Sequence, residues 1–170
     1  MNADVFILWM KILYAAPQSV LWLAKTNAAA QKNLLAVAKS IGVDTSRVIF
    51  AERVPAYSDH LDRYAVCDLF LDTFPYNAHT TTQDALTAGL PVLTKIGGAF
   101  HSRVAASILH SVNCQELICA SEAEYLQRAV YYYEQRDLLK NIQRKINLAM
   151  KGDRHNPYVR SLEDAYCRVL

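Results

Sequence analysis

The chain has 170 residues, and its 18 basic and 16 acidic side chains leave a formal net charge of +2. Hydrophobic residues make up 52% and charged residues 20%, which excludes an intrinsically disordered chain. The small net charge predicts neither a nucleic-acid nor a membrane-surface partner. The apolar runs are far shorter than the roughly 20 residues that span a bilayer. The length suits one domain, or one lobe of a larger enzyme.

The start of the chain and its cysteines both favour a cytoplasmic protein. Asp4 precedes the first apolar stretch and Lys11 interrupts it, which is not the charge pattern of a secretion signal. The chain has four cysteines, Cys67, Cys114, Cys119 and Cys167. They form no C-x-x-C pair and have no histidine at zinc spacing. We therefore expect reduced thiols rather than disulfides or a metal site.

Apolar spacing and turn residues predict alternating helices and strands through the first two thirds of the chain. Helices are expected at 5–13, 27–41, 58–64, 80–88 and 102–109, the third of them starting at Ser58 or Asp59 and the last capped by Ser102. Strands are expected at 20–23, 47–50, 68–72 and 91–94, with a short strand or turn near 117–118. Because the connections are short, this alternation indicates a Rossmann-like parallel sheet with helices on both faces.

The last third of the chain is predicted to be helical. A helix is expected over 121–150, opened by a capping box of Ser121 and Glu124. Residues 151–153 break it, and Pro157 opens a last helix that runs to residue 170. We therefore expect a Rossmann-like lobe over residues 1–120, and C-terminal helices over 121–170 that pack on the same lobe.

The segment after the strand at 68–72 has the most unusual composition. Ligands of open parallel sheets bind beyond the carboxyl ends of the strands, where this segment lies. His79 and a run of threonines stand at the start of the expected helix, whose free N–H groups and hydroxyls suit a phosphate or pyrophosphate. Asp84 lies one turn after Thr80 and could accept hydrogen bonds from a sugar diol. The simpler alternative is plain helix capping by the threonines and a solvated histidine.

The expected helix at 58–64 carries a second candidate. His60 and Arg63 share one helical face, where an imidazole can stack on a base and a guanidinium can reach a carbonyl oxygen. The alternative is a surface helix in which Asp59, Asp62 and Arg63 form solvated ion pairs. The chain has neither a G-x-G-x-x-G nor a P-loop motif, so neither a dinucleotide site nor a P-loop is indicated.

These residues belong to a series of segments that resembles the O-GlcNAc transferase family. The segments include NAHTT at 77–81, DAL at 84–86, AGLPV at 88–92 and SRVAAS at 102–107, and the resemblance covers about residues 8 to 170. It implies the C-terminal, nucleotide-binding lobe of a two-lobed glycosyltransferase of the GT-B type. Members transfer GlcNAc from UDP-GlcNAc to Ser or Thr hydroxyls of proteins with inversion and without a metal, and relatives transfer fucose or glucose. The resemblance thus implies no cofactor.

The resemblance also implies seven donor-site residues, grouped by the part of UDP that they contact. They are His79, Thr80 and Thr81 for the diphosphate, Asp84 for the ribose, and His60, Arg63 and the backbone of Val54 for the uracil. Arg103 matches a family position, for which we expect a structural or acceptor-side role. The catalytic residues are not identified, because the resemblance places them outside this lobe.

The chain also departs from the family pattern. Members carry a Lys two residues after the proline that matches Pro55, and this chain has none there. The family's lobe opens with a strand that bears a phosphate-binding Lys, and this chain is expected to start after it. The expected partners are UDP or UDP-GlcNAc, a protein acceptor, and an N-terminal lobe in cis or on another chain. Activity of this chain alone is not expected. The alternative is a non-enzymatic nucleotide-binding or interaction module of flavodoxin-like architecture.

Overall fold

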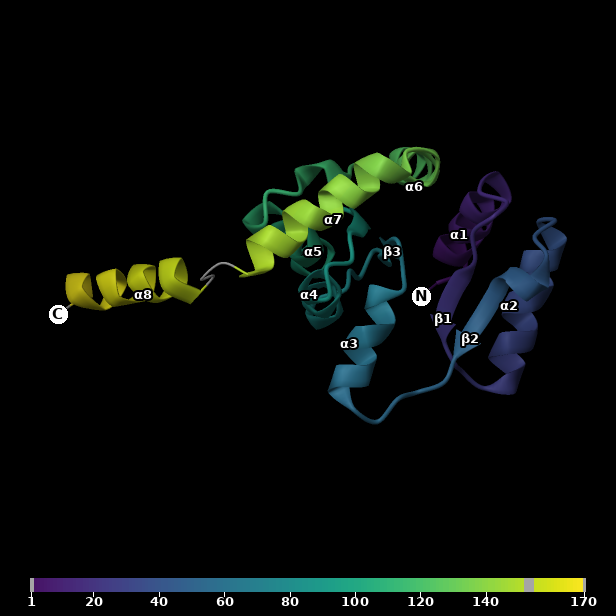
Figure 1. The fold of residues 1–170 in the computed structure, drawn as a ribbon, viewed down its shortest axis with the longest axis horizontal. Coiled ribbons are helices and arrows are strands. Elements are labelled where there is room, and N and C mark those ends of the chain that lie inside the picture. The colour runs from purple at the N-terminus through teal and green to yellow at the C-terminus, as the bar shows by residue number, and fades with distance from the viewer. Residues whose placement is uncertain (1, 152–154, 170) are drawn as a thin grey trace.

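Parallel strands form the centre of the structure, a computed structural model that describes residues 2–151 and 155–169 (Figure 1). The strands are β1 Leu21–Ala24, β2 Val48–Ala51, β3 Phe70–Leu71, β4 Val92–Lys95 and β5 Ile118–Cys119. β1 pairs with β2, and β3, β4 and β5 pair in that order, always in parallel. In register, Leu21 lies opposite Val48 and Phe70 opposite Val92. This confirms the predicted α/β class and divides the strands between two sheets.

The described residues contain eight α-helices, of which α2 to α5 lie between successive strands, as predicted. They are α1 Ala3–Ala15, α2 Ala28–Ser40, α3 Tyr57–Ala65, α4 Thr80–Thr87, α5 Val104–Ser111, α6 Glu122–Glu134, α7 Arg136–Lys151 and α8 His155–Val169. The expected cap of α2 is present, since the Asn27 side chain accepts a hydrogen bond from the Ala30 N–H at 2.8 Å. The glycines that follow α2 and α4, Gly42 and Gly89, have positive φ angles of 84° and 79°, as a helix C-terminus requires.

Two predicted helix starts are wrong. α3 begins at Tyr57 rather than at Ser58 or Asp59, and the residue at its N-cap, Ala56, has no side-chain acceptor. Ser102 does not cap α5, because its hydroxyl bonds to the backbone of Ala99 within a 3₁₀ turn at Phe100–Ser102. Ser58, Asp59 and Ser102 are residue types that favour a turn or a helix cap, but the hydrogen bonds that such side chains form decide where the helix starts.

The helical C-terminal part is divided more finely than predicted. The helix expected over 121–150 is broken at Gln135 into α6 and α7. Ser121 caps α6 by accepting from the Glu124 N–H at 3.1 Å, whereas the Glu124 carboxylate accepts from the Ala120 N–H at 2.6 Å, one residue before the cap. Of the predicted break at 151–153, only Lys151 is described, and it ends α7. Likewise the helix expected from Pro157 to 170 is described as α8, from His155 to Val169.

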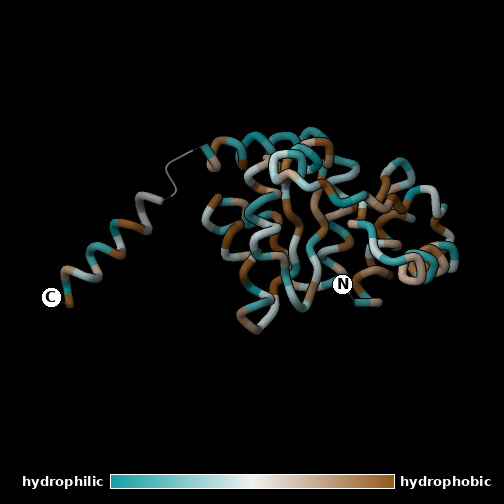
Figure 2. The backbone as a smooth tube through the Cα atoms, turned by 90° about the horizontal axis from the view of Figure 1, so that it is seen from below, coloured by the Kyte–Doolittle hydropathy of each residue, from teal (hydrophilic) through white to brown (hydrophobic). Residues whose placement is uncertain are grey.

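α1 and α6 pack together and carry much of the core. Phe6 and Met10 of α1 are buried, and the indole N–H of Trp9 donates to the hydroxyl of the fully buried Tyr125 of α6 at 3.3 Å. α6 also contacts β4, and α7 contacts α4. By contrast, α8 extends away from the other elements with alternating hydrophobic and hydrophilic residues (Figures 1 and 2). No helix among the described residues is long and apolar enough to cross a membrane.

A cavity of about 1380 Å³ lies where the two sheets fail to join. Residues of both β1 and β3 line it, together with side chains of α1, α3, α6 and α7. Within the described residues, β1 and β3 are not paired with each other. The carboxyl-end loop after β3 opens into the same cavity, which places the candidate site beside the gap between the sheets.

Candidate functional site

The start of α4 presents backbone and hydroxyl donors that no protein group uses. The helix begins at Thr80, as predicted, and His79 stands at its N-cap without a side-chain capping bond. Thr82 is buried, and its hydroxyl donates to the Ala78 carbonyl at 2.8 Å. Within residues 2–151 and 155–169, the hydroxyls of Thr80 and Thr81 bond to no other protein group. The first turn is therefore open to an anion, with Thr80 and Thr81 rather than Thr82 as its hydroxyl donors.

A buried carboxylate holds the loop that leads to α4. Asp72 is fully buried, and its Oδ1 accepts hydrogen bonds from the N–H groups of Thr73 at 2.8 Å and Ala78 at 2.7 Å. Its Oδ2 accepts from the Thr94 hydroxyl of β4 at 2.6 Å. Burial raises the pKa of Asp72 to about 6, although these hydrogen bonds act in the opposite direction. β3 covers only Phe70–Leu71 of the strand predicted at 68–72, although the Asp72 N–H still donates to the Leu93 carbonyl of β4 at 3.0 Å.

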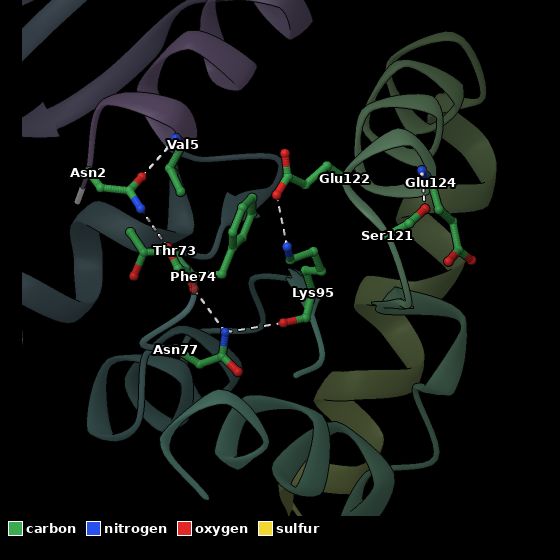
Figure 3. A network of polar contacts seen from close by, with 9 residues as sticks. All are labelled: Asn2, Val5, Thr73, Phe74, Asn77, Lys95, Ser121, Glu122 and Glu124. Atoms are coloured by element: carbon green, nitrogen blue, oxygen red, sulfur yellow. Dashed lines mark hydrogen bonds and ion pairs between the residues drawn. The ribbon is translucent and has the colours of Figure 1, made fainter. Parts of the chain in front are cut away.

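Asn77 fastens the same loop from a second side. Its amide nitrogen donates to the carbonyls of Thr73 at 2.8 Å and Lys95 at 3.4 Å (Figure 3). Its backbone N–H donates to the His101 carbonyl at 3.0 Å. Its Oδ1 is buried and meets no donor among the described residues. The two orientations of the Asn77 amide are not equivalent, because the flipped one would place the amide oxygen against the carbonyl oxygens of Thr73 and Lys95.

Neighbouring elements add further support to this loop. The Tyr125 hydroxyl of α6 donates to the Asp72 carbonyl at 3.0 Å. Asn2, which caps α1, donates to the Phe74 carbonyl at 3.5 Å, and the Lys95 ammonium lies 4.2 Å from the centre of the Phe74 ring (Figure 3). The loop conformation is thus set by contacts from α1, β4 and α6.

His79 is held by an aromatic stack at the start of α4. Its ring lies 5.0 Å from that of Tyr76 at 22°, and Tyr76 lies 5.4 Å from His101 at 9°. The Nε2 of His79 is 3.4 Å from the His101 carbonyl oxygen. A proton on Nε2 would donate to that carbonyl, whereas a proton on Nδ1 would be free to donate to a ligand, so the role of His79 toward an anion depends on which ring nitrogens carry a proton.

α3 carries the second pair of predicted residues. His60 contacts the ring edge of Tyr64 at 5.0 Å, and the Arg63 guanidinium carbon lies 6.0 Å from the ring centre of Trp22 in β1. None of the ion pairs among the described residues involves Asp59, Asp62 or Arg63. α3 is a surface helix without a buried residue, as the alternative has it, but the ion pairs that the alternative expects are not present among the described residues.

A hydrogen bond joins α3 to α4 at the predicted ribose-binding carboxylate. The Tyr57 hydroxyl donates to Oδ1 of Asp84 at 2.6 Å, and this bond raises the pKa of Tyr57. The sequence did not single out Tyr57, because an exposed tyrosine at the first position of a short helix carries no periodic signal. The sequence analysis did not identify Asp72, Asn77 and Tyr125 as supports of the loop. A polar residue just after an apolar strand could have indicated the first two, and nothing in the sequence indicated Tyr125.

The structure gathers most of the predicted site residues around one cavity. His60, Arg63, His79, Thr80 and Thr81 all line the cavity of about 1380 Å³. Asp84 and Val54 do not line it; Asp84 is tied to α3 through Tyr57, and Val54 precedes α3.

Two further observations concern side chains outside this group. The guanidinium of Arg103 donates to the Gly97 carbonyl at 3.0 Å, which gives this residue a structural contact in the loop before α5. Among the described residues, no group of three or more His, Cys, Asp and Glu side chains is arranged to hold a metal ion.

Sequence comparisons connect this arrangement to known proteins. The family described as Glycosyl transferase family 41 matches residues 1–156. The chain is 34% identical over 142 residues to a UDP-N-acetylglucosamine--peptide N-acetylglucosaminyltransferase of Caenorhabditis elegans, which covers 84% of this chain and 12% of that protein. It is 30% identical over 151 residues to a probable enzyme of the same name, SPINDLY, of Solanum lycopersicum, covering 86% of this chain and 16% of that protein.

A solved structure extends the likeness to the fold. A mutant of the O-GlcNAc transferase of Thermobaculum terrenum superposes with a TM-score of 0.89 at 29% sequence identity. The match covers 99% of this chain and 33% of that one. The chain therefore spans between 12% and 33% of the length of these relatives.

Proposed function

The chain belongs to glycosyl transferase family 41, and we propose that it forms the UDP-sugar-binding lobe of an inverting, O-GlcNAc transferase-like enzyme of the GT-B type. The observation that carries this proposal is that the start of α4 and the face of α3 line one cavity, which the loop at the carboxyl end of β3 also enters. The start of α4 supplies hydrogen-bond donors for an anion, and α3 supplies the imidazole of His60 and the guanidinium of Arg63. A nucleoside diphosphate needs both.

Each part of UDP has a matching group. The diphosphate binds the first-turn N–H groups of α4, the hydroxyls of Thr80 and Thr81, and His79. The uracil stacks on His60 and is read by Arg63 and the backbone of Val54, although the Val54 side chain does not line the cavity. The ribose hydroxyls donate to Asp84, which faces α3 through its bond to Tyr57.

The proposed reaction is a direct displacement at C1 of the sugar. The hydroxyl oxygen of a protein Ser or Thr forms a bond to C1 while the bond from C1 to the diphosphate oxygen breaks. UDP leaves with the electron pair, and the hydroxyl proton passes to a base that the donor lobe does not supply. Negative charge grows on the diphosphate as it leaves, where the α4 dipole and hydroxyls stabilise it without a metal ion.

Transfer also requires a partner to this lobe. The acceptor hydroxyl has to be held against C1, and one lobe offers a single wall of that cleft. We propose that a second lobe, in the same polypeptide or in another, supplies the other wall. The facing edges of β1 and β3 support this, because among the described residues neither strand is paired on that side and a further parallel strand from the partner could pair with both. The chain by itself is expected to bind the donor and not to transfer it.

Calorimetry with UDP and UDP-GlcNAc tests the proposal directly. The chain is expected to bind both, and UDP should raise its melting temperature. His79→Ala and Asp84→Ala should each weaken binding, whereas His110→Ala, an exposed histidine on α5, should leave it unchanged. Saturating UDP that gives neither heat nor a rise in melting temperature would exclude the donor-site function for this chain.

A further inference from the structure

We propose that Tyr57 reads the ribose: together with Asp84 it forms an acceptor pair for a cis-diol, which selects ribonucleoside over 2′-deoxyribonucleoside diphosphates. This rests on the proposed function, because it assigns the ribose subsite of the same donor site. It adds a residue that neither the sequence motifs nor the likeness to the family singles out.

The hydrogen bond between the two side chains fixes their roles. The Tyr57 hydroxyl has one proton, and the 2.6 Å bond commits it to Oδ1 of Asp84. The phenol oxygen therefore keeps its lone pairs as acceptors. No side chain among the described residues bonds to Oδ2 of Asp84. Two acceptor atoms, the phenol oxygen and Oδ2, are thus available on either side of one shared proton, and a cis-diol has two hydroxyls to donate.

The position of Tyr57 agrees with the order of the parts of a nucleotide. Its ring centre lies 6.5 Å from that of His60, the residue proposed to stack on the uracil, at an interplanar angle of 36°. Its hydroxyl reaches Asp84, which lies one helical turn after Thr80, at the diphosphate end of the site. The ribose joins base and diphosphate, and the pair joins the two helices whose His60 and Thr80 line the cavity, although neither Tyr57 nor Asp84 lines it itself.

A purely structural role does not account for this bond. Tyr57 is 61% exposed, and its ring fills no part of the core. The bond to Asp84 is exposed as well, and an exposed bond of this kind adds little to folding. Removing the hydroxyl alone should therefore leave the fold intact.

The experiment compares the affinities of UDP and 2′-deoxy-UDP by calorimetry. The wild-type chain should bind UDP more tightly than 2′-deoxy-UDP. Tyr57→Phe should weaken UDP binding about 3- to 10-fold, which is the effect of one lost hydrogen bond. It should weaken 2′-deoxy-UDP binding less, so that the ratio of the two affinities moves closer to one. Asp84→Asn should bring the affinities for UDP and 2′-deoxy-UDP still closer together. Tyr14→Phe, at an exposed tyrosine of α1, is the matched control and should change neither affinity.

The outcomes separate this inference from the function on which it rests. If the wild-type chain binds neither nucleotide, the proposed function itself falls. If it binds UDP but does not discriminate against 2′-deoxy-UDP, or if Tyr57→Phe leaves the ratio unchanged, the role of Tyr57 is overturned and the donor site stands. Tighter UDP binding by Tyr57→Phe would also overturn it, since Tyr57 would then be a competitor of the ribose. Equal melting temperatures of the variant and wild type should accompany the expected result.

Discussion

The Asp72 carboxylate accepts a 2.6 Å hydrogen bond from the Thr94 hydroxyl across the β3–β4 pair, and both residues are fully buried. Its other oxygen holds the N–H groups of Thr73 and Ala78. An ionisable group thus acts as the internal support of the loop that ends at His79. Its burial makes the charged form costly, and this cost should be measurable as a dependence of stability on pH.

We expect Asp72→Asn to flatten the pH dependence of the free energy of unfolding. The pKa of Asp72 is raised from 3.8 to about 6, so the folded state binds its proton more tightly than the unfolded state does. Stability from this group is therefore fully present below pH ~4 and is lost as the pH rises to about 6. The difference amounts to about 3 kcal/mol at most.

Asparagine suits this test because it keeps an oxygen for Thr73 and Ala78 and offers an N–H₂ to the Thr94 hydroxyl. Urea unfolding at several values between pH 4 and pH 7 measures the effect in both proteins. Equal slopes for Asp72→Asn and wild type would show that Asp72 does not titrate in this range.

The threonine run should divide into ligand-binding and structural members. Thr82 is buried and bonded to Ala78, so Thr82→Ala should lower the free energy of unfolding by about 1–3 kcal/mol. Thr80→Ala and Thr81→Ala should change stability by less than about 0.5 kcal/mol and weaken UDP binding several-fold. Thermal unfolding and UDP calorimetry on the three variants check this. UDP affinities that fall equally with all three would contradict the division.

The start of α4 could be predicted because a polar, uncapped helix start after an apolar strand is a local pattern. The same holds for Asn27, whose capping bond spans three residues. The support of the loop is different in kind. Tyr125 lies 53 positions after Asp72, and only the packing of α6 over the strands brings its hydroxyl to that carbonyl.

The contact between Tyr57 and Asp84 was equally hidden, because it depends on how α3 lies against α4. The division of the strands into two sheets is also a non-local property. Each strand from 20–23 to 91–94 was expected within one or two residues of its place, yet apolar patterns do not say which edges pair.

Tyr125→Phe should destabilise the chain, although it removes a single oxygen from the core. That hydroxyl donates to the Asp72 carbonyl at 3.0 Å and accepts from the Trp9 indole at 3.3 Å. Phenylalanine would leave both partners buried and unpaired, at a cost of about 1–3 kcal/mol each before relaxation. Chemical denaturation should show a lower midpoint with an unchanged m-value. Tyr131→Phe is the control, because Tyr131 is 50% exposed on the same helix and should change stability by less than about 0.5 kcal/mol. A variant as stable as wild type would mean that these two bonds contribute nothing net.

Binding of UDP should not depend on a divalent cation. In the proposed diphosphate subsite, the first-turn N–H groups of α4, two threonine hydroxyls and His79 stabilise the negative charge, so the chain's own groups take the place of a cation. The affinity for UDP measured by calorimetry in the presence of EDTA should therefore lie within about two-fold of that measured in untreated buffer, a difference of less than about 0.5 kcal/mol. The His79→Ala variant makes the comparison sharper, because loss of a donor should weaken binding equally with and without EDTA. Binding that is abolished by EDTA and restored by Mg²⁺ would contradict the metal-free subsite, since the cation and not the start of α4 would then hold the diphosphate.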